Sequence, residues 1–458
     1  MNKSLVTIYI TNYNYGNYIE ESIESVLNQT YYNYELIIID DGSTDNSFEI
    51  LKKYKSYDKI KIIYQKQKGL TATNNVALRN SNGVYIVRLD ADDYLDENAI
   101  ELMVNELDKN KKIALVFPDY TLIDRDGNRI KKIKRHNFDN EVKLFDQPAH
   151  GACTLIRVDI LKKLGGYDEE FDRQDGYSLW LKVIRQFKVK NINKSLFYYR
   201  QHNTNLTQNE KKLLYTRAKI KSKAVKELNN KKKEVLTIIP VRGQEIDSNS
   251  QPMKEIKGKP LINWTIDAAL ESQSCNHIYI STPDNNLITY IKDSYGTSIK
   301  TFKRDSSLAR LNIGIEHTIL ELLKNLSIKN IKPDYILLLY IEYPFKEGWQ
   351  IDEALHTAEL FDVEVVDGII LNNEIFYKHD GSGLKPLIKD SFLHLEREQL
   401  YRRVGSINLI KTEYLINGGK IMDGRIGHIN LDQKSAFQIK SNLDWQIANF
   451  LAEKKINE

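Results

Sequence analysis

Carboxylates gather at two places in the first part of the chain, and each group ends an apolar run. Asp40 and Asp41 close the run "YELIIIDD", and Asp90, Asp92 and Asp93 close the run "YIVRLDADD". Carboxylates this close together repel one another unless a cation or hydrogen-bond donors compensate their charge. A hard divalent ion such as Mg²⁺ or Mn²⁺, bridging to a diphosphate, would supply that compensation. Each motif alone is also typical of a turn with helix-capping aspartates, but both together favour a ligand site.

These motifs need a scaffold that brings strand ends together, and the pattern of the chain predicts one. Short β-rich runs such as "SLVTIYIT" and "KIKIIYQ" alternate with helical stretches such as "YIEESIESVLNQ". This alternation predicts a parallel α/β sheet, in which ligands bind at the carboxyl ends of strands. After the polar stretch "ELNNKKKE" the alternation restarts with "VLTIIP". We therefore expect a first domain at residues 1–228 with a basic C-terminal helix, a linker at 229–234 and a second domain at 235–458.

Basic residues are concentrated at residues 208–233, where ten Lys and Arg stand against two Glu, although the whole chain of 458 residues carries only +4. Nucleic-acid binding would need stacking aromatics among the basic residues, and only Tyr215 is present, so we expect no nucleic-acid partner. A solvated helix running into a linker is the simpler interpretation of this segment. Contact with an anionic membrane surface is the alternative.

Composition also bears on the compartment. The N-terminus lacks the apolar stretch of a signal peptide, and no window approaches a membrane span. Cys153 and Cys275 belong to no ligand-spaced cluster, which argues against a zinc site or a disulfide scaffold. We expect a cytoplasmic protein, with peripheral attachment to the inner face of the membrane as the alternative.

The stretches "VTIYITNYNYGNYIEESIESVLNQTYYNYELIIIDDGSTDNS", "GLTATNN" and "GVYIVRLDADDYL" resemble the family 2 glycosyltransferases of the GT-A fold. The resemblance runs from about Ser4 to His202 and implies a Rossmann-like, mostly parallel sheet. It also implies inverting transfer from a nucleotide-diphosphate sugar, usually a UDP-sugar, to a surface-glycan or lipid-linked acceptor, with Mn²⁺ or Mg²⁺. By position in the motifs, Asp41 would contact the nucleobase, Asp90 the ribose or sugar, and Asp92 the metal.

Further site residues follow from the same resemblance. The nucleotide would be flanked by residues at the first two strand ends: Thr11, Tyr13 and Asp40. Arg200 and His202, in "YYRQHNT", would close over the diphosphate. In the family a Glu-Asp pair commonly precedes an apolar-Trp run, and the matching stretch here is "QDGYSLW", so the pair is not intact.

The reaction requires a base near the acceptor hydroxyl. Asp175, in "QDGYSLW", is the carboxylate at the right place, and we expect it to be that base. The alternative is that Asp175 only caps the helix that contains Leu179 and Trp180.

The second half, from about Val235 to Leu451, resembles the cytidylyltransferases that activate sialic acid and related sugars, through "TIIPVRG", "GKPLINWTIDAAL" and "HIYISTPDN". This implies a second Rossmann-like α/β domain, often a homodimer in that family. Arg242 is kept from the phosphate loop, but Gln251 replaces its second lysine. Gln438 and Lys440 replace the carboxylates of the metal motif, and lysine cannot ligate Mg²⁺ at neutral pH.

The leading hypothesis is therefore a metal-dependent, inverting glycosyltransferase that carries a cytidylyltransferase-like domain without catalytic activity. A bifunctional glycosyltransferase and CMP-sugar synthetase is the first alternative. A non-catalytic sugar-binding or scaffold protein is the second.

Overall fold

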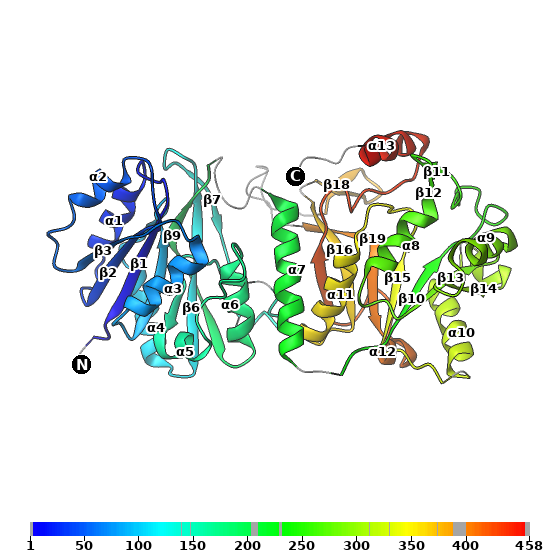
Figure 1. Ribbon diagram of the computed structural model, residues 1–458, viewed down its shortest axis with the longest axis horizontal. Coiled ribbons are helices and arrows are strands. Elements are labelled where there is room, and N and C mark those ends of the chain that lie inside the picture. The colour runs from blue at the N-terminus through cyan, green and yellow to red at the C-terminus, as the bar shows by residue number, and fades with distance from the viewer. Residues whose placement is uncertain are drawn as a thin grey trace. The chain divides into compact units, whose positions relative to one another are not determined.

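The computed structural model describes residues 3–138, 140–146, 148–202, 209–228, 231–310, 312–328, 330–372, 374–387 and 400–453. The chain forms two compact units, Met1–Gln208 and Asn209–Glu458 (Figure 1). Each unit is an α/β domain built on one main sheet, which confirms the predicted fold class.

Within the described residues, the first unit is built on a nine-stranded sheet with the order β3-β2-β1-β4-β8-β6-β9-β5, and β7 pairs with β6. Its elements are β1 (Val6–Asn12), α1 (Ile19–Leu27), β2 (Tyr34–Asp40), α2 (Ser47–Lys52), β3 (Ile60–Tyr64), α3 (Leu70–Asn80), β4 (Tyr85–Asp90), β5 (Tyr94–Leu95), α4 (Ala99–Lys109), β6 (Ile113–Ile123), β7 (Arg129–Ile133), β8 (Leu155–Arg157), α5 (Val158–Lys163), α6 (Asp175–Ile184) and β9 (Lys188–Arg200).

The strand β1 lies at the centre of the parallel part of this sheet, between β2 and β4. All seven of its residues are buried, as expected of a parallel strand covered on both faces. Its apolar side chains join those of β2, β4, α1 and α4 in one core. The register places Thr11 opposite Asp90 and Asn12 opposite Asp40, so both acidic motifs end at the same edge of the sheet.

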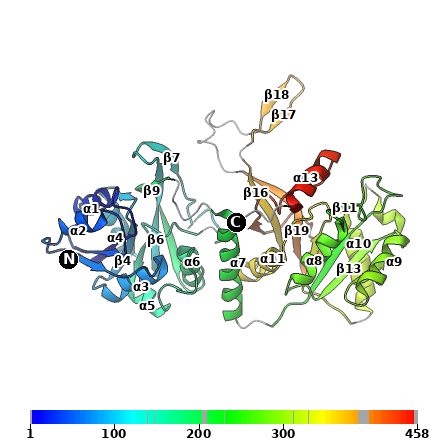
Figure 2. The ribbon, with the colours of Figure 1, turned by 45° about the horizontal axis from the view of Figure 1, so that its top comes forward.

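The second unit has, in its described residues, a seven-stranded sheet with the order β14-β13-β10-β15-β19-β16-β20. Its elements are α7 (Glu210–Glu227), β10 (Val235–Pro240), β11 (Glu255–Ile256), β12 (Lys259–Pro260), α8 (Leu261–Glu271), β13 (His277–Thr282), α9 (Asn285–Tyr295), β14 (Lys300–Lys303), the 3-10 helix η1 (Ser306–Ala309), α10 (Ile315–Ser327), β15 (Tyr335–Leu339), α11 (Gly348–Phe361), β16 (Val365–Asn372), β17 (Tyr377–His379), β18 (Leu384–Pro386), β19 (Leu400–Lys411), α12 (Thr412–Ile416), β20 (Ile426–Asn430) and α13 (Asn442–Glu453). The hairpin of β17 and β18 stands away from the sheet (Figure 2).

The Lys-rich helix α7 packs on α11, inside the second unit. Its inner face buries Leu214 and Ala218, and Lys221 is buried in an ion pair with Glu353, with Nζ 2.7 Å from Oε1. The predicted first domain, residues 1–228, would include this helix at its end. The structure differs and divides the chain after Gln208, because the apolar stripe of α7 and its buried lysine find their partners on α11.

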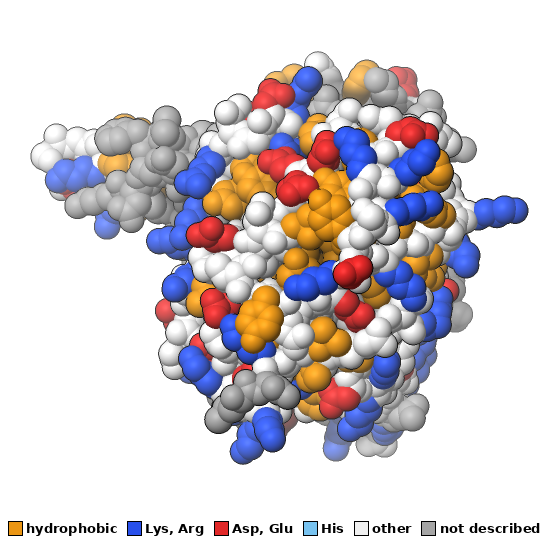
Figure 3. All heavy atoms as spheres, turned by 90° about the vertical axis from the view of Figure 1, so that its left-hand side faces the viewer, with side chains coloured by type: hydrophobic (Ala, Val, Ile, Leu, Met, Phe, Trp, Pro, Cys, Tyr) orange, Lys and Arg blue, Asp and Glu red, His pale blue; other side chains and the backbone are white. Residues whose placement is uncertain are grey.

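One face of the molecule carries side chains of both charges. On the face drawn in Figure 3, basic side chains are interspersed with acidic and hydrophobic ones. Among the helices of the described ranges, none has both the length and the apolar character needed to cross a bilayer.

Candidate active site

The carboxyl ends of β1, β2 and β4 bring the first set of predicted residues together. Thr11 Oγ1 donates a hydrogen bond to Asp90 Oδ1 at 3.3 Å. Asp40 Oδ1 accepts from Asn12 Nδ2 at 2.7 Å and from Ser43 Oγ at 2.5 Å. Asp40 therefore connects the turn after β2 to the end of β1. Asp90, at the end of β4, contacts the same end of β1.

The carboxylate of Asp41 holds the segment that leads into α3. Its Oδ1 accepts from Gln65 Nε2 at 2.7 Å and from the backbone N–H of Lys68 at 2.8 Å. Its Oδ2 accepts from the backbone N–H of Gly69, also at 2.8 Å. Asp41 is thus buried and fixed in place, whereas Tyr13, just beyond β1, is 40% exposed.

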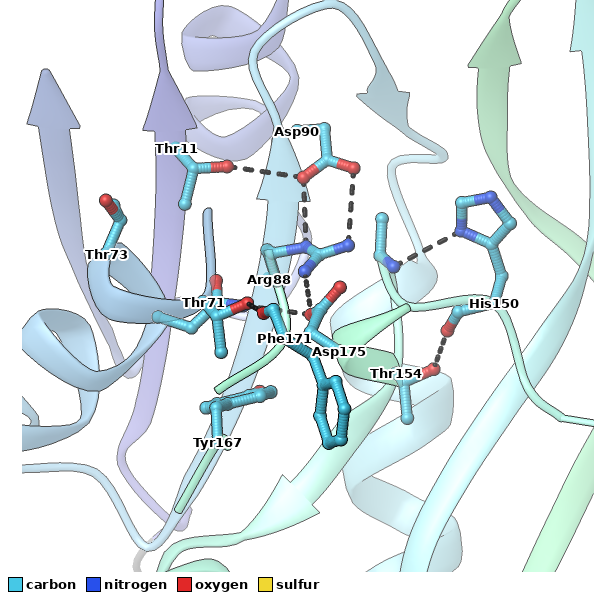
Figure 4. A network of polar contacts seen from close by, with 12 residues as sticks. Thr11, Thr71, Thr73, Arg88, Asp90, His150, Thr154, Tyr167, Phe171 and Asp175 are labelled. Carbon is cyan, nitrogen blue, oxygen red and sulfur yellow. Dashed lines mark hydrogen bonds and ion pairs between the residues drawn. The ribbon is translucent and has the colours of Figure 1, made fainter. Parts of the chain in front are cut away.

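A buried arginine connects the sheet to α6. Arg88 lies on β4 two residues before Asp90, so both side chains leave the same face of the strand. Its Nε is 2.9 Å from Asp90 Oδ1, and its Nη1 is 2.5 Å from Asp175 Oδ2 (Figure 4). Asn74 Nδ2 on α3 donates to the same oxygen of Asp175 at 2.9 Å. One guanidinium thus joins the first carboxylate of the second acidic motif to the predicted base.

Arg88 is a site residue to which the sequence motifs do not point, although its local sequence carries a signal. An arginine inside the apolar run "YIVRLD" must find a buried partner, since burial of an unpaired guanidinium is strongly unfavourable. Asn74, in the motif "GLTATNN", lies on α3 and contacts this ion pair.

Asp175 is the first residue of α6, after Gln174 in a left-handed conformation with φ 59°. The capping alternative requires its carboxylate to accept from backbone N–H groups of the first turn. Within the described residues, the hydrogen bonds of this carboxylate come instead from Arg88 and Asn74, both to Oδ2. Its position is therefore set by tertiary contacts.

The end of β9 brings a second set of predicted residues together. His202 Nε2 lies 2.8 Å from Asp92 Oδ2, and the imidazole stacks on the ring of Tyr18 at 5.7 Å between centroids. Arg200 is buried, and its Nε donates to the backbone oxygen of Asp92 at 2.9 Å. Its own backbone N–H donates to Asp93 Oδ1 at 2.9 Å. Arg200 thus holds the acidic motif in place through hydrogen bonds. His202 contacts Asp92, the predicted metal ligand, directly.

Negative charge at this edge of the sheet is incompletely compensated. Burial raises the pKa of Asp90 to about 6, against the opposing effect of Arg88. Burial and the carboxylate of Asp92 raise the pKa of Asp93 well above its usual range. Asp93 Oδ2 is buried without a hydrogen-bond partner among the residues that the structure describes. Among all the residues that the structure describes, no group of three or more His, Cys, Asp or Glu is arranged to hold a metal ion.

The residues predicted to mark a degenerate second site lie in two segments, at the β10–β11 loop and before α13: Arg242, Gln251, Gln438 and Lys440. The backbone N–H of Lys440, whose side chain is exposed, donates to Asp444 Oδ2 at 2.9 Å. Asp444, a carboxylate close to the predicted metal motif, therefore acts as a cap at the start of α13.

Family models match segments of both halves. The family model "Glycosyl transferase family 2" matches residues 7–165, and the family model "Cytidylyltransferase" matches residues 236–359. Chondroitin synthase from Escherichia coli is 34% identical over 202 residues, which are 44% of this chain and 29% of that one. Hyaluronan synthase from Pasteurella multocida is 32% identical over 203 residues, 44% of this chain and 21% of that one.

An uncharacterized glycosyltransferase from Haemophilus influenzae is 33% identical over 216 residues, 44% of this chain and 67% of that one. The chain thus spans less than a third of the two synthases and two thirds of this third relative. Among solved structures, TarS 1–349 of S. aureus in complex with UDP-GlcNAc is similar, with 16% identity and a TM-score of 0.42, covering 49% of this chain and 66% of that one.

Proposed function

Since the chain belongs to glycosyl transferase family 2 and is a glycosyltransferase, we propose that its first unit transfers a sugar from a UDP-sugar to a glycan or lipid-linked acceptor, with inversion at the anomeric carbon. The observation that carries this proposal is the meeting of two acidic motifs at one edge of the sheet, where Thr11 lies opposite Asp90 and Asn12 opposite Asp40. Such an edge is where open α/β sheets bind nucleotides.

Donor binding is assigned to the strand ends. Asp41 would face the nucleobase, and its hydrogen bonds to Gln65 and to the backbone of Lys68 and Gly69 hold the loop that borders this position. Asp90 would contact the ribose or sugar hydroxyls. Thr11 and the exposed ring of Tyr13 would flank the nucleotide.

A divalent cation, Mn²⁺ or Mg²⁺, is part of the proposal. The residues fit an ion held by fewer than three protein ligands, because Asp92 and Asp93 are buried next to Asp90 and Asp93 Oδ2 has no partner in the described chain. Asp92 and His202, which are in contact, would hold the ion together with oxygens of the donor diphosphate. The ion would neutralise charge on the departing diphosphate.

Asp175 is proposed to take the proton of the acceptor hydroxyl. Arg88 and Asn74 both bind Oδ2, and the structure shows no hydrogen bond to Oδ1 from any described residue, which leaves one oxygen available for an acceptor. The ion pair with Arg88 also fixes the orientation of the carboxylate.

The second unit is proposed to be non-catalytic, in support of the first. Gln251, Gln438 and Lys440 stand at positions where a nucleotidyltransferase would need lysine or carboxylates. The match to the cytidylyltransferase family favours the bifunctional alternative. Incubation of the full chain with CTP and a nonulosonic acid separates the two, since pyrophosphate release would establish the synthetase.

Membrane attachment and a homodimer stay predictions. Three lysines of residues 208–233 are already used inside the second unit, since Lys211, Lys221 and Lys233 pair with Glu347, Glu353 and Asp334. The segment therefore has fewer basic groups to offer an anionic lipid surface than its composition indicates.

The function is tested by incubating the purified full chain with a panel of UDP-sugars and Mn²⁺ or Mg²⁺, with and without a chelator. Release of UDP with one donor, lost on chelation, is the expected result. Release that persists in chelator would remove the metal from the proposal, and absence of release with every nucleotide-sugar would support a binding or scaffold role.

A further inference from the structure

One face of the helix α3 is polar and buried, and it holds the segment that leads into α6. Thr71 Oγ1 donates to the backbone oxygen of Phe171 at 2.7 Å (Figure 4). Asn75 Nδ2 donates to the backbone oxygen of Tyr167 at 2.9 Å, and Asn75 Oδ1 accepts from the backbone N–H of Tyr167 at 3.0 Å. Because buried polar groups are stable only when they are hydrogen-bonded, these contacts fix the backbone on the approach to Asp175.

Asn74, on the same face of α3, contacts Asp175 with one end of its amide and Tyr9 on β1 with the other. Its Nδ2 donates to Asp175 Oδ2 at 2.9 Å, and its Oδ1 accepts from the hydroxyl of Tyr9 at 3.2 Å. A carboxylate in an ion pair with arginine only accepts hydrogen bonds, so the amide must turn its NH₂ group to Asp175 and its oxygen to Tyr9. The proton that Tyr9 donates therefore favours the one orientation of the amide in which Asn74 can bind Asp175.

A second hydroxyl holds Tyr9 in place. The hydroxyl oxygens of Tyr9 and Tyr167 are 3.2 Å apart, and Tyr167 belongs to the segment that α3 fixes. Tyr9 and Asn74 have no exposed surface, and Tyr167 is 8% exposed. Burial raises the pKa of Tyr167 to about 12 and that of Tyr9 well above its ordinary value, so both hydroxyls keep their protons. The hydroxyl of Tyr9 thus remains a hydrogen-bond donor at neutral pH.

We propose that Tyr9 and Asn74 are positioning residues that orient the carboxylate of Asp175 toward the acceptor. The inference rests on the proposed function, in which Asp175 Oδ1 takes the acceptor proton. Arg88 holds Oδ2 through Nη1, and this single contact leaves the carboxylate free to turn about it. Asn74 binds the same oxygen from α3 and prevents that rotation, while Tyr9 fixes Asn74. Transfer depends on such alignment, since a displacement of about 1 Å can lower a rate about 10²-fold.

Tyr9→Phe tests the proposal, because it removes the hydroxyl and keeps the ring. We expect kcat for transfer to fall roughly tenfold, whereas the KM for the donor and the Kd of UDP measured by calorimetry stay unchanged. The matched control is Tyr54→Phe, which removes the hydroxyl of another buried tyrosine, bonded to Glu24 Oε1 at 2.8 Å, and should leave kcat unchanged. Equal kcat values for the two variants would overturn the proposal.

An effect of Tyr9 that acts through Asp175 should disappear when Asp175 is replaced. In the Asp175→Asn background, Tyr9→Phe should lower the residual kcat by less than about twofold, because there is no longer a base to orient. A tenfold fall in both backgrounds would show a general structural effect and would overturn the positioning role.

Urea unfolding gives a readout that does not depend on activity. The shifts in the urea midpoint caused by Tyr9→Phe and by Asp175→Asn should not add in the double variant, because the two side chains are coupled through Asn74. Additive shifts would overturn the proposal even if the chain transfers sugar. If the unsubstituted chain transferred no sugar, the proposed function would fail, and non-additive midpoints would still support the orienting contact with Asp175.

Discussion

The guanidinium of Arg88 lies against the carboxylate of Asp175, with Nη1 2.5 Å from Oδ2, and both side chains are buried. The pair joins β4 to the first residue of α6. Through Nε the same arginine also contacts Asp90, so it connects the proposed base to the proposed donor site. Substitution of either Arg88 or Asp175 should therefore affect both the stability of the first unit and its activity.

Arg88→Met should destabilise the first unit by roughly 3–5 kcal/mol, because it leaves the buried carboxylate of Asp175 without its partner. Urea unfolding of the full chain, followed by the fluorescence change of the first unit, measures the effect. Arg125→Met, which removes an arginine with a 77% exposed side chain, is the control and should change stability by less than about 0.5 kcal/mol. Similar stabilities for the two variants would show that the ion pair is not a structural requirement.

Asp175→Asn should lower kcat for transfer by roughly 10²–10⁴-fold while KM for the donor changes little, because a general base acts on the acceptor. The asparagine keeps the size of the side chain and Arg88 keeps its contact with Asp90, so the loss of stability should be smaller than that of Arg88→Met. A Tm well above the assay temperature checks that the variant is folded. If kcat were unchanged, Asp175 would have only a structural role.

Asp92→Ala should abolish metal-dependent turnover, and His202→Asn should raise the concentration of Mn²⁺ needed for half-maximal activity. Both follow from the 2.8 Å contact between these side chains at the proposed cation position. Activity measured over a Mn²⁺ titration distinguishes the two effects. Glu97→Ala, which removes an exposed carboxylate from the same region, is the control. An unchanged dependence of activity on Mn²⁺ in the Asp92→Ala variant would contradict the metal assignment.

Lys221→Met should destabilise the second unit by roughly 3–5 kcal/mol, because Glu353 would be left buried and unpaired. Hydrogen exchange measured by mass spectrometry should show the loss of protection in α7 and α11. Lys219→Met removes an exposed lysine two residues before and should leave exchange unchanged. Replacing Lys221 and Glu353 together by methionine should restore most of the stability, since neither charge then remains buried.

The stability of the first unit should fall as the pH is lowered through 6.5, in part because of His150. Burial, and then the charges of Arg88 and Arg135, lower the pKa of its imidazole from 6.5 to about 3. Between these values the unfolded chain binds a proton that the folded chain does not, so folding loses up to about 1.4 kcal/mol per pH unit. His150→Gln should flatten this dependence of the urea midpoint on pH. His136→Gln, at an exposed position, should leave it in place.

Much of the first unit was predictable because its signals are local. The alternation of apolar runs and helical stretches specified an α/β sheet, and the acidic motifs that end β2 and β4 indicated where a ligand would bind. The family followed from the same short motifs. The division between the two units was less predictable, because the composition of α7 says nothing about which sheet its apolar stripe covers.

The sequence by itself determined the family, the α/β class of both units and the strand ends that carry the carboxylates. Only the tertiary structure decided which groups face one another. Arg88 and Asp175 are 87 residues apart in sequence, and Asp92 and His202 are 110 residues apart. Each pair forms only because strand register and helix packing place its members within a few ångströms, and side-chain pairing over such separations is not encoded in any local pattern.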